Sequence, residues 1–283
     1  MRITGKTQVY LIVGDPVEQV RAPEVFNLVF ERTGIDAILV PARIAPQQLD
    51  GFIRTVFQAA NVAGMFLAIP HKAPAMRVLD ECSALARAAG AVNAIRRDLE
   101  GRLIGALFDG QGFVSALDHF GIPWRGKRTL VIGAGGGASA IAASLAAGHA
   151  ASVTLYDPVP GKALEVAVRV QSGFPGCTLH AAHSSDPAGF DVVVNASPLG
   201  LGIDDPLPCD VARIEGHACV VDILMKNQPT PFVRGARARG LVAQPGFEML
   251  IQQAPHYLEF FGHTAAAQTL RQNADFVREL IST

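Results

Sequence analysis

Short apolar runs alternate along the chain with amphipathic stretches whose apolar residues recur at helical spacing. The apolar runs predict strands, because the strands of a buried parallel sheet are apolar for most of their length. In chain order the expected strands are residues 9–14, 37–40, 63–69, 129–132, 152–156, 191–194, 219–222 and 241–243. Strands that alternate with helices are typical of βαβ units, so the expected fold class is α/β with parallel sheets.

The amphipathic stretches predict the helices between these strands. From Pro46 to Ala60 the apolar positions fall on one face of a helix. A proline near its start and a glycine after its end predict a second helix from Pro23 to Thr33. Further helices are expected at 113–120, from 247 and from 264. The last of them should bury a face made of Ala267, Leu270, Ala274, Phe276 and Leu280.

Chain length and a change of pattern near residue 108 predict the domain organisation. A β-hairpin is expected within residues 91–108, and the 283 residues are enough for about two domains. We expect a first α/β domain over residues 1–108 and a second over 109–246. Residues 247–283 should form C-terminal helices.

Charge and composition narrow the class of protein. The chain has 24 Lys and Arg against 25 Asp and Glu, a formal net charge of −1 and 49% hydrophobic residues. A nearly neutral chain is expected to bind neither nucleic acid nor an anionic membrane surface. Its apolar runs are too short or too interrupted for a signal peptide or a membrane span, and its four cysteines have no disulfide or CxxC spacing. We expect a folded cytoplasmic protein with reduced thiols.

A glycine-rich segment follows the strand expected at 129–132. It reads Gly133-Ala134-Gly135-Gly136-Gly137-Ala138 and matches the pattern GxGxxA at the entry to an alanine-rich helix. In this pattern the first glycine permits a tight turn, the second lets a pyrophosphate approach the backbone, and the last small residue lets the helix pack on the strand. The pattern alone is weak, because glycines also make plain strand-to-helix turns. The strand before it, and the helix and strand after it, favour a dinucleotide site.

Asp157 follows the next expected strand and lies 24 positions after Gly133. This is close to the spacing of about 20 positions at which the pattern has an acidic residue. An acidic residue near this spacing accepts hydrogen bonds from the ribose 2′-hydroxyl of NAD and repels the 2′-phosphate of NADP. The segment 158–160 supplies no arginine, and Lys162 is the only nearby cation. The sequence therefore predicts NAD in preference to NADP. In the alternative interpretation, Asp157 only caps a turn with Pro158.

Further motifs occur in an order that resembles the shikimate dehydrogenase family over most of the chain. They are Gly14-Asp15-Pro16 followed by Pro23, Ile69-Pro70-His71-Lys72, Gly90-Ala91-Val92-Asn93, Asp109-Gly110, the glycine loop, Asn195-Ala196-Ser197-Pro198-Leu199-Gly200, Thr230-Pro231-Phe232 and Met249-Leu250-Ile251-Gln252-Gln253-Ala254. Each motif is weak alone, but their shared order is specific. The resemblance implies a substrate domain, a Rossmann domain that binds NAD, and C-terminal helices that pack back on the first domain. It also implies reversible hydride transfer with a cyclic hydroxy acid similar to shikimate or quinate.

The same resemblance implies roles for individual residues. Lys72 and Asp109 would be the catalytic pair at the reacting oxygen, and which of them moves the proton stays open. Asn93 and Gln253 would bind ring hydroxyls of the substrate. Besides the glycine loop and Asp157, the cofactor would contact Asn195, Ser197, Pro198, Leu199, Ile223 and Gly246. The plainer alternatives are a surface lysine, a helix-capping aspartate and ordinary amides.

The chain departs from the family pattern on the substrate side. Val20 and Ala22 stand where the family has two serines that bind the substrate carboxylate, and Ala68 stands where it has a threonine. Each lost hydrogen bond to a carboxylate is worth about 1.5–3 kcal/mol, unless Arg21 between the two positions compensates. We therefore expect a less polar or differently substituted cyclic alcohol or ketone as substrate. Further apolar replacements are Phe66, Leu107, Phe108 and Met225.

The expected function is that of a dehydrogenase that acts on the CH–OH group of a small cyclic hydroxy acid or a related alcohol or ketone. The alternative is a non-enzymatic NAD-binding sensor or partner-binding protein with a decayed substrate site. The lost serines favour that alternative, and the retained Lys72 and Asp109 oppose it. No metal site is expected, because His180 and His183 have no carboxylate cluster beside them. The protein is expected to be a monomer or a homodimer.

Overall fold

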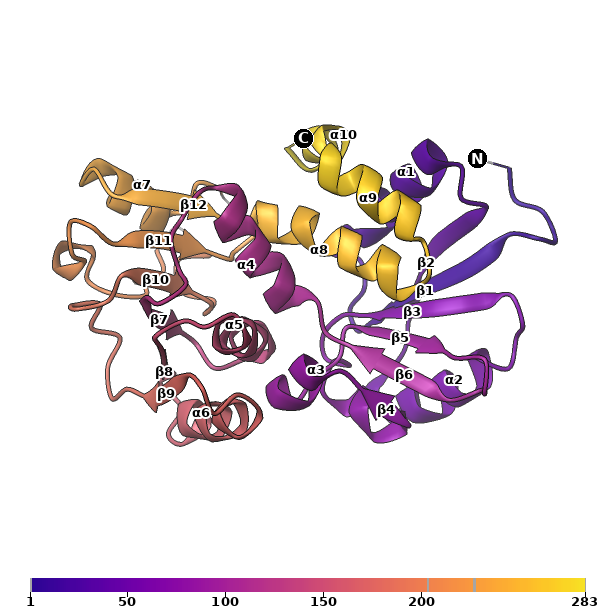
Figure 1. The fold of residues 1–283 in the computed structure, drawn as a ribbon, viewed down its shortest axis with the longest axis horizontal. Coiled ribbons are helices and arrows are strands. Elements are labelled where there is room, and N and C mark those ends of the chain that lie inside the picture. Colours follow the sequence, from indigo (N-terminus) through magenta and orange to yellow (C-terminus); the bar gives the residue numbers. More distant parts are fainter. Residues whose placement is uncertain (1, 203, 226–227, 283) are drawn as a thin grey trace. The chain divides into compact units, whose positions relative to one another are not determined.

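The computed structural model describes residues 2–202, 204–225 and 228–282, and in it the chain splits into two compact units. The first unit comprises the residues up to Phe108 and those from Gln253 onward, and the second unit comprises Asp109–Gln252. Each unit is built around a sheet of its own (Figure 1). No helix within the described ranges combines the length and the apolarity that crossing a bilayer requires.

The sheet of the first unit is mixed. Its strands are β1 (Gln8–Gly14), β2 (Ala37–Arg43), β3 (Val62–Leu67), β4 (Glu81–Cys82), β5 (Ala94–Arg97) and β6 (Leu103–Ala106). They lie in the order β2-β1-β3-β5-β6-β4. β1 pairs in parallel with β2 and β3, whereas β5 pairs antiparallel with β3 and with β6. The antiparallel pair of β5 and β6 confirms the predicted hairpin, and the two-residue strand β4 was not predicted.

Aromatic side chains fill the core of the first unit. Its helices are α1 (Ala22–Thr33), α2 (Leu49–Val56), α3 (Ala84–Ala89), α9 (Thr264–Gln272), α10 (Asp275–Ser282), the 3-10 turns η1 (Pro46–Gln48) and η2 (Pro74–Val78), and the end of α8 (Phe247–Phe260). The ring of Phe66 in β3 stacks on that of Tyr257 in α8, with centroids 4.4 Å apart. Gly64 leaves room for Phe261, because a Cβ atom at Gly64 would lie 2.4 Å from that ring. These contacts hold α8 against the sheet.

The structure divides the expected C-terminal helix into α9 and α10. Asn273 lies between them, and its Oδ1 accepts the first N–H of α10 at 2.8 Å, as the cap of a new helix does. Phe276 and Leu280, which were expected to be buried, are half-buried. The buried positions of α10 are the next ones along, Val277 and Ile281. The helix expected at 46–60 likewise begins as the 3-10 turn η1 and ends early, at Val56.

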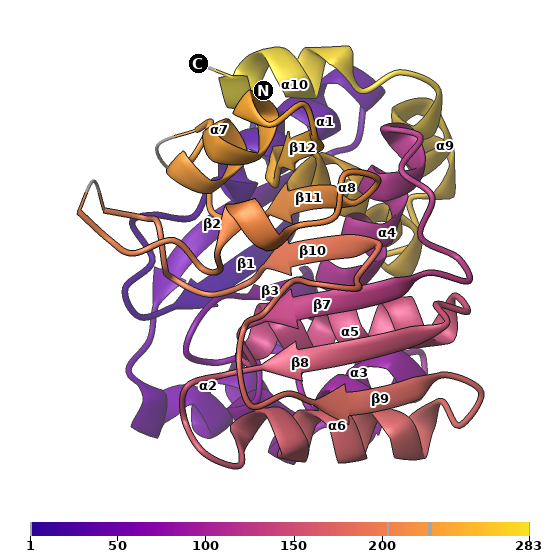
Figure 2. The same cartoon turned by 90° about the vertical axis from the view of Figure 1, so that its left-hand side faces the viewer.

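The sheet of the second unit is parallel at every described pairing. Its strands are β7 (Arg128–Ile132), β8 (Ser152–Tyr156), β9 (Thr178–Ala181), β10 (Val192–Asn195), β11 (Cys219–Asp222) and β12 (Val242–Pro245). Figure 2 shows them in the order β12-β11-β10-β7-β8-β9. Counted from β7, this is the Rossmann order 3-2-1-4-5-6, whose ligands bind where the order reverses. The reversal lies between β7 and β10, and it confirms the predicted Rossmann fold.

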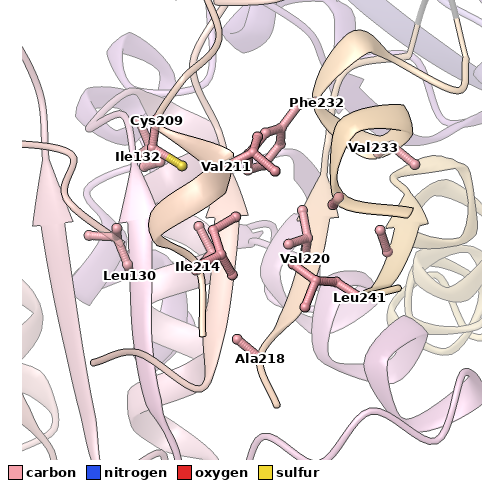
Figure 3. Packing of buried hydrophobic residues seen from close by; sticks show 13 residues of the cluster. Leu130, Ile132, Cys209, Val211, Ile214, Ala218, Val220, Phe232, Val233 and Leu241 are labelled. Atoms are coloured by element: carbon pink, nitrogen blue, oxygen red, sulfur yellow. The ribbon is translucent and has the colours of Figure 1, made fainter. Parts of the chain in front are cut away.

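Small and apolar side chains pack the helices of the second unit. These are α4 (Asp109–His119), α5 (Gly136–Ala147), α6 (Lys162–Gly173), α7 (Pro231–Ala238), the 3-10 turn η3 (Val211–Arg213) and the start of α8. α4 touches α5 so closely that a Cβ atom at Gly110 would lie 1.9 Å from the carbonyl oxygen of Ala140. On the sheet, Val211 and Phe232 belong to a buried cluster with Ile132 and Val220, which Figure 3 shows from close by. The strands β7, β10, β11 and β12 therefore share one apolar core.

Candidate functional site

Lys72 lies in the turn that follows β3 of the first unit. This turn is fixed by backbone hydrogen bonds, because the N–H of Ala68 donates to Val13 in β1 at 2.8 Å and the N–H of His71 donates to Ala68 at 2.9 Å. The carbonyl of Lys72 accepts the N–H of Val92 at 2.9 Å. The backbone of Lys72 is therefore fixed by hydrogen bonds to segments on both sides of it, and its side chain is half-buried.

Asn93 is buried completely and connects several segments of the same unit. Its carbonyl accepts the N–H of Leu67 at 2.8 Å and the hydroxyl of Tyr257 at 3.2 Å. Its Oδ1 accepts the N–H of Phe108 at 3.0 Å. Asn93 Nδ2 and the Oε1 of buried Gln253 have no partner among the described residues. Buried polar atoms without partners are rare in native proteins, so these two positions are suited to a polar ligand.

Arg21 does not take the place of the missing serines. Its guanidinium donates to the carbonyls of Ile281 and Leu280 at 2.8 and 3.0 Å, in the last turn of α10, and it pairs with Glu24 at 3.1 Å. These contacts use the donors of Arg21 inside the unit. The sequence could not show this, because the carbonyls lie about 260 residues away along the chain.

The other departures from the family pattern divide into core and surface positions. Phe66 and Phe108 are buried, and the ring of Phe108 meets that of Tyr257 at 4.9 Å. These two rings therefore belong to the core of the first unit. Val20, Ala22 and Ala68 are half-buried and carry no polar side-chain atom. Met225 is also half-buried, at the end of a described range.

Asp109 begins α4 in the second unit and is buried. The residue before it is Phe108, whose N–H is held by Asn93. The residue after it is Gly110, whose contact with α5 excludes any side chain. Phe108 is therefore held within the first unit, and Gly110 is held within the second.

The glycine loop of the second unit has the geometry of a phosphate-binding turn. Gly133 has a φ of 111°, and a Cβ atom there would lie 2.5 Å from the carbonyl oxygen of Ala196. Only glycine fits such a position without strain. A Cβ atom at Gly135 or Gly136 would meet nothing within 4 Å, so the backbone is open on that side. Gly137 and the fully buried Ala138 follow in the first turn of α5, whose free N–H groups favour an anion. The loop therefore fits the pyrophosphate of a dinucleotide.

Asp157 serves the structure of this loop. Its carboxylate accepts the N–H of Ala134 at 2.8 Å and that of Val159 at 3.0 Å, and it lies 3.3 Å from the ammonium of Lys162. Burial alone would raise the pKa of Asp157, but the hydrogen bonds from Val159 and Ala134 and the contact with Lys162 hold it below its usual value. The charge of Asp157 is thus matched within the turn.

Asn195 supports the loop that follows β10. Its Oδ1 accepts the N–H and the hydroxyl of Ser197 at 3.1 and 2.7 Å, and its Nδ2 donates to the carbonyl of Leu199 at 3.0 Å and to Asp222 at 3.1 Å. Both polar atoms of the Asn195 side chain therefore have hydrogen-bond partners within the protein. Of the predicted contact residues in this loop, Ser197 and Leu199 are half-buried and Pro198 is exposed.

Asp222, at the end of β11, is a residue that the sequence-based site did not include. It is completely buried and accepts hydrogen bonds from Thr230 Oγ1 at 2.7 Å and from Asn195 Nδ2 and the Leu224 N–H at 3.1 Å each. Burial raises the pKa of Asp222 in spite of these donors. Gly246 approaches the same segment, because a Cβ atom there would lie 2.6 Å from the Cα of Ile223. An aspartate at the end of an apolar strand was the only available signal.

Comparison with known proteins assigns the chain to a family. A family model described as the shikimate dehydrogenase substrate binding domain matches residues 12–95. The shikimate dehydrogenase (NADP(+)) of Acidiphilium cryptum is 38% identical over 267 residues, which cover 93% of this chain and 94% of the relative. The chain belongs to the shikimate dehydrogenase family. Like its curated relatives it is an oxidoreductase that acts on a CH–OH group, as the sequence predicted.

Solved structures extend the match to the whole fold of the family. Shikimate 5-dehydrogenase from Thermus thermophilus, in complex with NADP(H) and shikimate, has a TM-score of 0.80 and 28% identity and covers 93% of this chain and 100% of that chain. A 5-ketofructose reductase from a Gluconobacter species has a TM-score of 0.83 and 26% identity, with coverages of 95% and 99%. These matches confirm the predicted α/β architecture.

The predicted preference for NAD over NADP is wrong in the light of the family. Its curated relatives are named as shikimate dehydrogenases of NADP(+). The prediction relied on a free carboxylate at Asp157. In the structure that carboxylate accepts the N–H groups of Ala134 and Val159 and lies beside Lys162, so it is engaged within the turn and is not the free acceptor that the prediction assumed.

Among the described residues, no group of three or more His, Cys, Asp or Glu side chains is placed to hold a metal ion. His180 lies in the edge strand β9, and His183 follows that strand.

Proposed function

We propose that this shikimate dehydrogenase family member transfers hydride reversibly between NADP(H) and a small cyclic alcohol or ketone, with Lys72 and Asp109 as its catalytic pair. The observation that carries the proposal is that two buried polar atoms of predicted substrate-binding residues, Asn93 Nδ2 and Gln253 Oε1, have no partner among the described residues. One is a donor and the other an acceptor, as the hydroxyl groups of a polyol ring require.

The glycine loop would hold the cofactor by its pyrophosphate. The N–H groups of Gly135, Gly136 and Gly137 lie where α5 begins and where no side chain obstructs the backbone. Lys162, the partly exposed cation beside Asp157, is suited to the 2′-phosphate. When bound, the nicotinamide ring supplies or accepts the hydride.

Lys72 and Asp109 would stabilise the charge of the reacting oxygen and exchange its proton. Negative charge develops on this oxygen when a ketone receives hydride, and an ammonium stabilises it. In the reverse direction the hydroxyl proton needs an acceptor at the same place. A lysine paired with a carboxylate can serve both directions.

The substrate proposed is uncharged. A carboxylate would have to bind near Val20, Ala22 and Ala68, which offer no hydroxyl, while the guanidinium of Arg21 is engaged by Glu24 and by α10. Each missing hydrogen bond would cost a carboxylate about 1.5–3 kcal/mol. The similarity to a protein named 5-ketofructose reductase supports a keto compound without that group.

The direct test follows NADPH oxidation with two matched cyclic polyol ketones, one of which carries a carboxylate. We expect the higher kcat/KM with the uncharged ketone. Lys72→Ala should lower kcat by about 10²–10⁴-fold, the usual contribution of a proton-transfer group, while the Kd of NADPH stays unchanged. The exposed lysine of the same unit, in Lys6→Ala, is the control. Full activity of Lys72→Ala would remove that residue from the mechanism.

The missing serine hydroxyls at Val20 and Ala22 favoured the alternative of a non-enzymatic nucleotide sensor. The curated relatives, which are named as dehydrogenases, oppose that alternative. In the same assay, tight binding of NADPH without turnover of either ketone would contradict the proposed reaction.

A further inference from the structure

His71, which directly precedes Lys72, is buried completely. Its Nε2 lies 2.8 Å from the carbonyl oxygen of Ile44, in the segment between β2 and η1. A carbonyl oxygen only accepts hydrogen bonds, so Nε2 carries the hydrogen of this contact. The side chain of His71 therefore ties the turn that bears Lys72 to a segment about 27 residues earlier in the chain.

The segment that His71 reaches is itself anchored. The N–H of Ile44 donates to the carbonyl of Gly14 at 3.2 Å, and the N–H of Asp15 donates to that of Ile69 at 3.1 Å. Together with these two backbone hydrogen bonds, the hydrogen bond of the His71 ring links the end of β1, the end of β2 and the turn after β3 to one another. On its other side, the turn is held by the bond from Val92 to the Lys72 carbonyl.

Packing alone does not account for a histidine at this place. Nδ1 of His71 is buried and has no partner among the described residues. A buried polar atom without a partner is unfavourable, and an apolar side chain of similar size would avoid that penalty. What the histidine supplies, and an apolar residue lacks, is the Nε2 hydrogen bond to Ile44.

We propose that His71 is a positioning residue for the Lys72 ammonium: through the bond from Nε2 to Ile44 it holds the catalytic turn where Lys72 meets the substrate oxygen. The inference rests on the proposed function, because it concerns the geometry of the proposed catalytic lysine. It concerns no contact between His71 and substrate. Loss of the bond lets the turn move, and a displacement of about 1 Å at a reacting group can lower a rate by about 100-fold.

Two substitutions at one position test this role. The amide of a glutamine reaches the place of the histidine Nε2, whereas the shorter asparagine reaches only that of Nδ1. We expect His71→Gln to keep kcat within about threefold of the wild type and His71→Asn to lower kcat by about 10- to 100-fold. The KM of NADPH should stay unchanged in both. The matched controls are His263→Gln and His263→Asn, because His263 is bonded to the Tyr10 hydroxyl at 2.7 Å in the same unit. Both controls should keep kcat.

A second readout does not depend on activity. Hydrogen exchange at the Val92 amide, which donates to Lys72, should be faster in His71→Asn and unchanged in His71→Gln. Equal kcat and equal exchange in the two variants would overturn the proposal. If Lys72→Ala were fully active while the exchange difference remained, the proposed function would fail and the role of His71 in holding the turn would stand.

Discussion

At the scale of single residues, the second unit uses buried polar groups to hold its loops in place. Asn195 and Asp222 bind each other across the ends of β10 and β11, and each also fixes the backbone that follows it. The polar end of a parallel sheet is where a Rossmann fold places its ligand. These two residues therefore hold the loops at the edge of the sheet where the proposed cofactor would bind.

The raised pKa of Asp222 predicts a specific dependence of stability on pH. The folded protein binds this proton more tightly than the unfolded chain, so the contribution of Asp222 to stability is lost as the pH rises from the ordinary aspartate pKa through the folded one. Asp222→Asn cannot ionise. Its free energy of unfolding, minus that of the wild type, should therefore increase as the pH rises through this window, and urea titrations at successive pH values measure it.

Asp191 is the matched control for that experiment. Burial would raise the pKa of Asp191, but hydrogen bonds from Arg128 and His217 and the charge of Arg128 hold it below its usual value. Asp191 therefore stabilises the fold above the unfolded pKa, and the difference for Asp191→Asn should decrease as the pH rises. A flat difference for Asp222→Asn, or one of the same sign as the control, would contradict the assignment.

The glycine loop predicts that a side chain at Gly135 weakens the binding of NADPH without changing the stability of the fold. A Cβ atom at this position meets nothing within 4 Å, and its φ of −78° suits any residue. Gly135→Ala should therefore keep the free energy of unfolding within about 0.5 kcal/mol of the wild type. A methyl group at the open backbone should nevertheless raise the Kd of NADPH by about tenfold or more, because it lies where a pyrophosphate must approach.

Two further glycine variants serve as comparisons for Gly135→Ala. Gly51→Ala, in α2 and also with nothing within 4 Å, should leave the Kd of NADPH unchanged and should raise the free energy of unfolding by about 0.5–1 kcal/mol, because alanine favours a helix over glycine. Gly133→Ala should destabilise the fold, because its φ of 111° and the close carbonyl of Ala196 exclude a side chain. An unchanged Kd for Gly135→Ala would place the dinucleotide elsewhere.

At the scale of elements, the sequence predicted the long periodic segments and missed the short or interrupted ones. The strands on either side of the topological reversal, β7 and β10, are mostly apolar and could be recognised locally. The strands β4 and β9 are short or carry polar residues, so their pairing depends on distant neighbours. The division of α9 from α10 depends on one capping side chain, that of Asn273, inside an otherwise helical pattern.

Within the candidate site, the local motifs were predictable and the distant contacts were not. The glycine loop was predictable from its spacing together with the strand before it and the helix and strand after it, and its open backbone at Gly135 and Gly136 supports that interpretation. The partners of Arg21 and Asp222 lie in other elements, so no spacing rule could reveal them. The NAD prediction failed partly for the same reason, since the contact of Asp157 with Ala134 was not visible in the sequence. The turn cap of Asp157 and the nearby Lys162 were visible there, but they were given too little weight.

The end of α10 depends on Arg21. Its guanidinium binds the carbonyls of Leu280 and Ile281, where cations are favoured by the helix dipole and by carbonyls without helical partners. Arg21→Met should lower the free energy of unfolding by about 1–3 kcal/mol and increase hydrogen exchange in α10. The exposed arginine of α2, in Arg54→Met, is the control.

Arg21→Met should also leave the discrimination between the charged and the uncharged ketone unchanged, because the guanidinium serves the helix. A selective loss of activity toward the carboxylate-bearing ketone would instead show that Arg21 binds the substrate. The two ketones of the functional assay therefore measure both outcomes.

At the scale of the whole molecule, the residues of the proposed function belong to both units of the chain. The first unit contains Lys72, Asn93 and Gln253, and the second contains Asp109 and the glycine loop. The family match covers both units, as the 93% coverage of this chain by the Acidiphilium cryptum relative shows. The central claim of the proposal is therefore that Lys72 and Asp109 act together in catalysis, as the family resemblance implies.

A double-mutant cycle on kcat for the uncharged ketone tests this claim most directly. Groups that act together lose their effect together, so Lys72→Ala, Asp109→Asn and the double variant should have similar kcat values, each about 10²–10⁴-fold below the wild type. Wild-type affinity for NADPH in all three would show that the cofactor site is intact. Losses that multiply in the double variant, or a single variant with full activity, would contradict the account.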